Sequence, residues 1–105
     1  MAHAIGIEEF KKLVAEGAAP TLLDVRRKND YTAAPQTIET ARWLDPELVD
    51  TWAGAISTDR PVIVYCVKGG SVSQSVADRL MDKQVDVRYL EGGILAWHAA
   101  SGGHK

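Results

Sequence analysis

Residues Pro61 to Ser71, with the sequence PVIVYCVKGGS, decide the fold. The part from Val62 to Cys66 is a largely β-branched apolar run, which predicts a strand that is covered on both faces. A loop with two glycines follows, and from residue 72 to residue 81 apolar side chains recur at helical spacing. Ser71, with Gln74 three residues later, predicts a capping box at the start of this helix. The stretch is therefore predicted to be a strand, a cysteine, a tight loop and a helix.

The same alternation of strands and helices extends over the rest of the chain. Further strands are predicted at residues 21–25 and 85–90, and a last helix is predicted at residues 94–100. Near the N-terminus an amphipathic helix is predicted from apolar residues at helical spacing, namely Ile7, Phe10, Leu13 and Val14. This alternation indicates one α/β domain, in which helices cover both faces of a mostly parallel central sheet.

The segment that leads to the Val62 strand has weaker signals. Residues 26–40 are polar and without a clear period, so they are predicted to form a loop with one helical turn around residues 30–33. Asp45-Pro46-Glu47 is then typical of a helix start, with aspartate as the N-cap and proline at the first helical position. The buried face of this helix is predicted to consist of Leu48, Val49 and Trp52.

Length and composition limit the classes of protein that are possible. A chain of 105 residues corresponds to one domain, predicted to comprise residues 1–101, with a flexible tail at residues 102–105. The single cysteine excludes an intramolecular disulfide, and no apolar run is long enough for a membrane span. The net charge of −2 leaves no obvious basic face for a nucleic acid. The N-terminus lacks the pattern of a secretory signal, so a cytoplasmic protein is expected.

Cys66 is the candidate nucleophile. Ligands of open α/β folds bind beyond the carboxyl ends of the strands, and Cys66 stands at such an end, just before the N-terminus of a helix. The free amides and partial positive charge of a helix N-terminus favour a thiolate. Gly69 and Gly70 allow successive amides to converge on one point, and Lys68 adds a positive charge. The alternative is an inert buried cysteine, the commoner role of a lone cysteine in an apolar strand.

No metal or organic cofactor is expected. His3, His98 and His104 are scattered along the chain and have no ligand spacing with Cys66. The pair Gly92-Gly93 lacks the third glycine and the following acid of a dinucleotide-binding fingerprint.

Four stretches of the sequence resemble the rhodanese family. Leu22 to Arg26 (LLDVR) resembles the early strand of that family, and Pro61 to Cys66 resembles the strand that delivers its catalytic cysteine. Cys66 to Ser71 stands in the place of the active-site loop, and Leu90 to Trp97 (LEGGILAW) is similar to the C-terminal signature. The resemblance covers most of the chain and implies a rhodanese-like fold with a sheet of about five strands.

The resemblance also implies an activity, that of a thiosulfate sulfurtransferase. Such an enzyme moves a sulfane sulfur from thiosulfate or a similar small anionic donor to cyanide or a thiol, here through a persulfide on Cys66. A protein that accepts the sulfur is a further partner in this reading. The alternative is a non-catalytic or sensory rhodanese-like module that acts by protein interaction or by protein-to-protein sulfur relay.

The site residues follow from the matched motifs. The loop is predicted to bind the anionic group of the donor, and then the persulfide, through Val67, Lys68, Gly69, Gly70 and Ser71. Arg26 is predicted to contact the substrate from the neighbouring strand, with Asp24 and Trp97 in supporting positions. For Asp24 and Arg26 the alternative is an ion pair with a purely structural role.

One departure from the family and one rival class of enzyme bear on the substrate. Many rhodaneses carry an arginine near the end of the active-site loop, whereas this chain has Ser71, so the resemblance leaves the choice of donor open. A cysteine-dependent phosphatase uses the same strand, loop and helix, but places an arginine six residues after the cysteine. The residue at that position is Val72, which cannot clamp phosphoryl oxygens and argues against a phosphatase.

Overall fold

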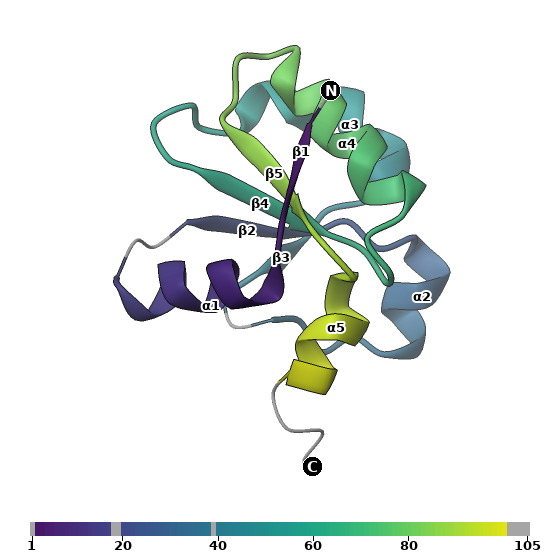
Figure 1. The fold of residues 1–105 in the computed structure, drawn as a ribbon. Helices are drawn as coiled ribbons and strands as arrows, with labels where there is room; N and C mark the ends of the chain where they lie inside the picture. The colour runs from purple at the N-terminus through teal and green to yellow at the C-terminus, as the bar shows by residue number, and fades with distance from the viewer. Residues whose placement is uncertain (1, 18–19, 39, 101–105) are drawn as a thin grey trace.

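The computed structural model describes residues 2–17, 20–38 and 40–100. At its centre lies a sheet of five parallel strands in the order β1-β5-β4-β2-β3 (Figure 1). The strands are β1 (His3–Ile5), β2 (Thr21–Asp24), β3 (Arg42–Trp43), β4 (Val62–Tyr65) and β5 (Val87–Leu90). The predicted α/β class and parallel sheet are confirmed, whereas the tail predicted at residues 102–105 lies outside the described residues.

Helices cover both faces of the sheet, as predicted. They are α1 (Ile7–Ala15), α2 (Lys28–Ala33), α3 (Val49–Trp52), α4 (Ser71–Met81) and α5 (Gly93–Ala100), with short 3-10 turns η1 (Pro46–Leu48) and η2 (Ala53–Ala55). Figure 1 shows α1 and α5 on one face of the sheet and α3 and α4 on the other. Val64 of β4 packs in the core under α3 and α4, while its neighbour Ile63 packs in the core under α1 and α5. Because both faces of β4 are covered, its sequence is continuously apolar.

Helix α4 begins differently from the predicted capping box, and that prediction is wrong. Gly70 is the N-cap residue, and no side chain caps this end of the helix. Ser71 is the first helical residue and is exposed. The side-chain amide of Gln74 donates instead to the carbonyl of Gly69, at 3.2 Å. The glycine loop thus moves the start of the helix one residue earlier than the serine signal indicates.

The segment after β3 begins as predicted but turns differently. The Asp45 side chain accepts a hydrogen bond from the Glu47 amide at 2.9 Å and caps η1. Val49 is buried and Trp52 is half-buried, but Leu48 is 54% exposed, so its predicted place on the buried face is wrong. The physical reason is the 3-10 turn, whose three residues per turn rotate Leu48 away from the face that an α-helix would give it.

The sequence pattern predicted neither of the two edge strands, β1 and β3. β1 has three residues and β3 has two, which is too short for an alternating pattern to be recognised. Their pairing with longer neighbours fixes them instead: β1 pairs with β5 and β3 pairs with β2. Edge strands of this length also limit the unpaired backbone that the sheet exposes.

Tyr65, at the end of β4, has a buried hydroxyl group that accepts a hydrogen bond from the Ile38 amide at 2.9 Å. Burial raises the pKa of Tyr65. Below pH ~10 the phenol is neutral in both the folded and the unfolded chain, but above it the unfolded chain ionises first, so the free energy of unfolding falls. We expect this alkaline loss to be smaller in Tyr65→Phe, measured by urea denaturation at pH ~8 and pH ~11. Equal losses in the two proteins would contradict the assignment.

The strand order brings two distant parts of the chain to one edge of the sheet. After β2 the chain adds β3 on one side and then β4 and β5 on the other, so its direction reverses between β2 and β4. Ligands of parallel α/β sheets bind at the carboxyl ends of the strands, at such a reversal. Arg27 follows β2 and Cys66 follows β4, and both line one cavity at this place.

Candidate active site

Cys66 forms part of the wall of the cavity at the strand reversal, which we call the cysteine cavity. The cavity has a volume of about 310 Å³. Its other lining residues are Arg27, Asp30, Val67, Lys68, Gly70, Ser71 and Val72. Cys66 is only 5% exposed, yet it borders a space that is large enough for a small anion.

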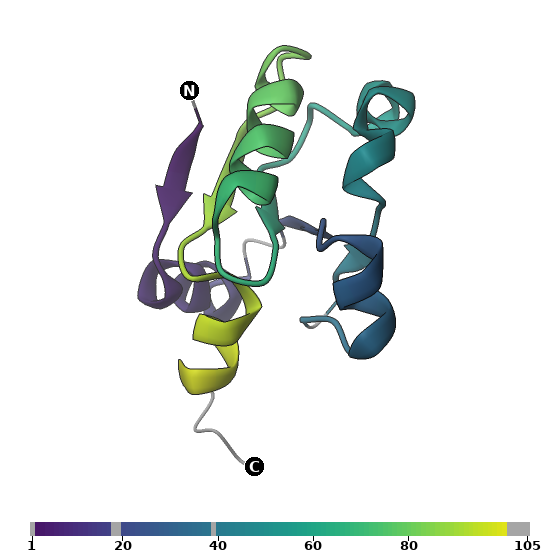
Figure 2. The same cartoon turned by 90° about the vertical axis from the view of Figure 1, so that its right-hand side faces the viewer.

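The start of α5 holds the outer side of the loop after Cys66. The Ile94 amide donates to the carbonyl of Cys66 at 2.9 Å, and the Leu95 amide donates to the carbonyl of Val67 at 3.2 Å. Gly93 permits this approach: its φ is +61°, and a Cβ atom there would lie 2.4 Å from the Cys66 carbonyl oxygen. Figure 2 shows the loop before α4 running beside the start of α5.

The first turn of α4 holds the second half of the loop. The Gln74 backbone amide donates to the carbonyl of Gly70, and its side-chain amide donates to the carbonyl of Gly69, both at 3.2 Å. Gly69 has a φ of +74°, and a Cβ atom there would lie 2.7 Å from the amide nitrogen of Gly92. Glycine is therefore required at this position for the loop to pack against the turn that precedes α5.

These contacts leave the amides of the loop free. In a trans peptide the N–H points opposite to the preceding carbonyl, and the described residues contain no cis bond. Because the carbonyls of residues 66, 67, 69 and 70 bind α5 or α4, the amides that follow them point away from those helices. Within residues 2–17, 20–38 and 40–100, no oxygen accepts a hydrogen bond from the amides of residues 67–73. The loop thus offers free N–H donors, and four of the five loop residues line the cysteine cavity.

Ser73 is a site residue that the sequence reasoning did not identify. Ser73 is fully buried, and its Oγ accepts a hydrogen bond from the Cys66 thiol at 3.3 Å. The same hydroxyl donates to the carbonyl of Gly70 at 3.4 Å. The signal was present in the helical pattern: Ser73 shares the inward face of α4 with Val76, Ala77 and Leu80. A serine on an otherwise apolar face, one turn after the cysteine loop, indicates a polar partner at the end of the strand.

Arg26 forms a buried ion pair with Asp24. Its Nε donates to both carboxylate oxygens at 3.0 and 2.9 Å, and its Nη2 donates to Oδ2 at 2.7 Å. Further N–H groups donate to the carbonyls of Ala34 and Gln36. Burial opposes the charged form, but the hydrogen bond and the charge of Asp24 outweigh it and raise the pKa of Arg26.

This geometry favours the structural role for the pair over the predicted substrate contact. Arg26 is 3% exposed, and its guanidinium donors are engaged with Asp24 and the chain after α2. Arg26 is also absent from the residues that line the cysteine cavity. The pair fixes the segment that follows β2 instead of facing a ligand.

Arg27, the next residue, reaches the cavity in its place. It is exposed, it lines the cysteine cavity, and among the ion pairs of the described residues none includes it. The burial of Arg26 and the exposure of Arg27 thus separate the two neighbouring arginines. No signal in the sequence marks Arg27, because Val25 and Arg26 before it are both buried.

Some of the other predicted site residues line the cysteine cavity, and the others do not. Val67, Lys68, Gly70 and Ser71 line the cysteine cavity, whereas Gly69 packs against the turn before α5. Trp97 lies under the sheet, where its ring meets Phe10 edge-on with 5.4 Å between centroids. Trp97 therefore anchors α5, the helix that holds the loop, and does not face the cavity.

Two further observations concern cofactors and membranes. In the part of the chain that the structure describes, no group of three or more His, Cys, Asp or Glu side chains is arranged to hold a metal ion. Among the same residues, every helix is too short or too polar to cross a membrane.

Comparisons with known proteins agree with this geometry. The family model of the rhodanese-like domain matches residues 6–100. The thiosulfate sulfurtransferase GlpE of Shewanella oneidensis is 33% identical over 89 residues, which are 84% of this chain and 85% of that protein. A rhodanese-like domain protein from Staphylococcus aureus has a TM-score of 0.79 at 22% identity, covering 90% of each chain. A rhodanese homologue from the extremely thermophilic bacterium Thermus thermophilus has a TM-score of 0.70 at 27% identity, covering 90% of this chain and 99% of that one.

Proposed function

The chain belongs to the rhodanese-like domain family, and from that premise we propose that it is a sulfurtransferase that carries a sulfane sulfur on Cys66. Its donor in this proposal is thiosulfate or a similar small anion, and its acceptor is cyanide, a low-molecular-weight thiol or a protein thiol. The observation that carries the proposal is the set of free loop amides beside Cys66 in a cavity of about 310 Å³.

The first half-reaction loads the cysteine. The Cys66 thiolate attacks the outer sulfur of thiosulfate, a new S–S bond forms, and the bond to the sulfonate sulfur breaks. Sulfite leaves with the electron pair of the broken bond, and Cys66 becomes a persulfide. In the resting state the Cys66 thiol donates a hydrogen bond to Ser73 Oγ, which orients Sγ, and the thiol proton is released to solvent before the attack.

The second half-reaction unloads the cysteine. Cyanide, or the thiolate of an acceptor, attacks the outer sulfur of the persulfide, and the S–S bond to Cys66 breaks. Cys66 returns as a thiolate, and the product is thiocyanate or an acceptor persulfide. Neither half-reaction has a net change in electrons, so no redox cofactor takes part.

The loop amides support the charge that moves through this cycle. The donor, the persulfide and the transition states between them are all anionic, and N–H groups fixed before the reaction stabilise such charge without reorganisation. The contacts from α4 and α5 to the loop carbonyls hold the amides in that orientation. Because the cycle depends on a reduced thiol, we place the activity in the cytoplasm.

Mass spectrometry of the intact protein after treatment with thiosulfate tests this proposal. We expect the mass of one added sulfur atom, located by peptide mapping on Cys66, together with release of sulfite. The added mass should disappear after cyanide is supplied, with thiocyanate as the product. A protein that gains no sulfur from thiosulfate or from any other small anionic donor would contradict the enzymatic proposal.

Lys68 gives a prediction for the first half-reaction. Its ammonium group is exposed and borders the cysteine cavity, so it should attract the doubly charged donor. We expect Lys68→Ala to slow persulfide formation from thiosulfate by about two- to fivefold, the range of an exposed charge pair. Discharge to a neutral thiol should change less, as measured in separate single-turnover experiments. The control is Lys83→Ala, which removes an exposed lysine beyond the far end of α4. If Lys68→Ala slows both half-reactions equally, Lys68 does not act on the donor.

A further inference from the structure

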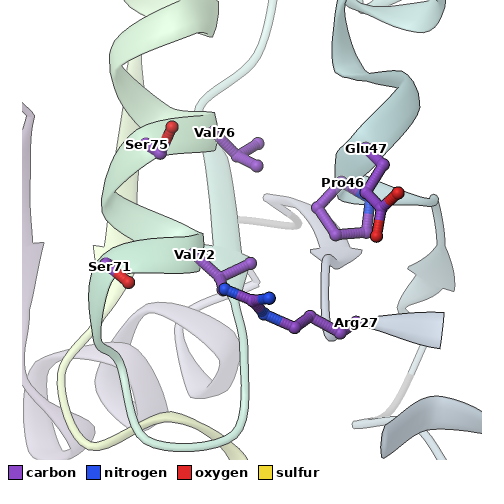
Figure 3. Close-up of a pocket in the computed structure, with 7 residues that line it drawn as sticks. All are labelled: Arg27, Pro46, Glu47, Ser71, Val72, Ser75 and Val76. Carbon is purple, nitrogen blue, oxygen red and sulfur yellow. The ribbon is translucent and has the colours of Figure 1, made fainter. Parts of the chain in front are cut away.

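A second cavity adjoins the cysteine cavity and is larger than it. Its volume is about 470 Å³, and it lies between α4 and the segment at η1 (Figure 3). Arg27, Ser71 and Val72 line both cavities, so the two spaces meet at these residues. We call the larger space the side chamber; Pro46, Glu47, Ser75 and Val76 line it and do not line the cysteine cavity.

The side chamber is not required by the small ligands of the first half-reaction. The cysteine cavity, at about 310 Å³, already exceeds the size of thiosulfate or cyanide. An adjoining space that opens beside the nucleophile suits a second, larger reactant. In a ping-pong cycle that reactant is the acceptor, which approaches the outer sulfur after the donor remnant has left.

The lining of the side chamber has two opposite charges and an apolar wall. Figure 3 shows Arg27 reaching across toward Val72, with Pro46 and Glu47 on the opposite side of the space. Glu47 and Arg27 are both exposed, and the ion pairs found among the described residues include neither. Val76 is buried and Val72 is half-buried; these valines on the α4 side and Pro46 on the opposite side give the chamber apolar walls (Figure 3).

We propose that the side chamber is the acceptor subsite, and that it selects low-molecular-weight thiols that carry both an ammonium and a carboxylate group. Glu47 pairs with the ammonium group, and Arg27 pairs with the carboxylate at the junction with the cysteine cavity. The carbon chain of the thiol lies on the valine and proline wall, and its sulfur points to the Cys66 persulfide. This inference rests on the proposed sulfur-transfer function and names the acceptor of that reaction.

Sulfur transfer to the acceptor at the junction needs no further reactant. The acceptor thiolate attacks the outer sulfur of the Cys66 persulfide, the S–S bond to Cys66 breaks, and Cys66 leaves as a thiolate. The acceptor departs as its own persulfide, and its charged groups take no part in the bonds that change. These charged groups therefore affect only the binding and orientation of the acceptor. Orientation raises the rate of transfer most when it holds the reacting atoms within a near-attack distance.

Two substitutions isolate the side chamber from the cysteine cavity. Glu47→Gln removes its carboxylate charge, and Ser75→Tyr fills the space from an exposed position on α4 that does not line the cysteine cavity. Glu8→Gln, an exposed acid on α1 across the sheet, is the matched control. Each protein is first loaded with thiosulfate, and its discharge is then timed with L-cysteine, cysteamine, 3-mercaptopropionate and cyanide.

The expected pattern is selective. Glu47→Gln should slow discharge to L-cysteine and cysteamine by about two- to fivefold, because both carry the ammonium group. It should leave 3-mercaptopropionate and cyanide unchanged. Ser75→Tyr should slow discharge to L-cysteine by at least about tenfold. Cyanide should still remove the outer sulfur of the persulfide at the rate of the parent protein. Uniform slowing with all four acceptors, or none with any, would overturn the assignment of the side chamber.

A binding measurement separates this inference from the proposed function. S-methyl-L-cysteine has both charges but no thiol, so its binding does not depend on persulfide chemistry. We expect it to shift the amide resonances of Glu47, Ser75 and Val76 in the parent protein and not in Ser75→Tyr. Shifts without any persulfide formation would refute sulfur transfer, and with it the acceptor role, and would leave only a binding site for such amino acids. Persulfide formation without shifts would refute the subsite and leave sulfur transfer standing.

Discussion

Cys66→Ser is expected to reduce thiosulfate-dependent sulfur transfer to the background of the assay buffer. The serine hydroxyl has nearly the shape of the thiol, but an oxygen nucleophile cannot form the persulfide on which both half-reactions depend. The fold should tolerate the change, because Ser73 Oγ lies where it can bond to the new hydroxyl. We expect the free energy of unfolding to change by no more than about 1 kcal/mol.

The measurement is thiocyanate production from thiosulfate and cyanide, with urea denaturation of the same samples. Loss of turnover in a folded Cys66→Ser protein supports the enzyme. If the parent protein also has no turnover with small donors, the chain fits the alternative of a module that acts by protein interaction. Turnover that persists in the serine variant would place the chemistry at another residue.

Gly93→Ala is expected to have the second largest effect, although Gly93 does not line the cysteine cavity. A Cβ atom at this position would lie 2.4 Å from the carbonyl oxygen of Cys66 and 2.5 Å from that of Val67, and the φ of +61° disfavours any other residue. The loop would have to move, and its amides would turn with it. We expect persulfide formation to slow by about 100-fold, the cost of misplacing a reacting group by about 1 Å. The free energy of unfolding should fall by about 2–4 kcal/mol.

Gly54→Ala is the control for this prediction. Gly54 lies in η2, and a Cβ atom there would meet no atom within 4 Å. Its stability and its rate of persulfide formation should match those of the parent protein. A Gly93→Ala protein that loses stability but forms the persulfide at the parental rate would show that α5 does not position the loop amides.

The centre of the fold could be predicted from the sequence because each signal there is local. Residues 62–66 are buried on both faces, and an unbroken β-branched run identifies such a strand without reference to its neighbours. The glycines after Cys66 and the apolar spacing of α4 are equally local. The contact between Cys66 and the start of α5 joins residues that lie far apart in the sequence, and no local signal indicates it.

The edge strands, the role of Arg26 and the side chamber depend on tertiary contacts, which the sequence of a single segment does not show. The strands β1 and β3 are too short to show a period, and they exist because longer strands lie beside them. For Arg26 the family resemblance implied a substrate contact and the residues alone allowed an ion pair with Asp24; the structure engages its guanidinium with Asp24 and two carbonyls. The side chamber joins the chain after β2 to η1 and α4, three segments that only the folded chain brings together.

The loop amides are the physical basis of the whole account, and their NMR signals test it most directly. Two-dimensional ¹H–¹⁵N spectra of the free protein and of the thiosulfate-loaded protein should differ most at the amides of residues 67–73, with downfield proton shifts as those groups begin to donate to the new sulfur. The amides of α1, on the opposite face of the sheet, should stay in place. A loaded protein, proven by its mass, in which the signals of residues 67–73 do not move would contradict the claim that these amides hold the persulfide.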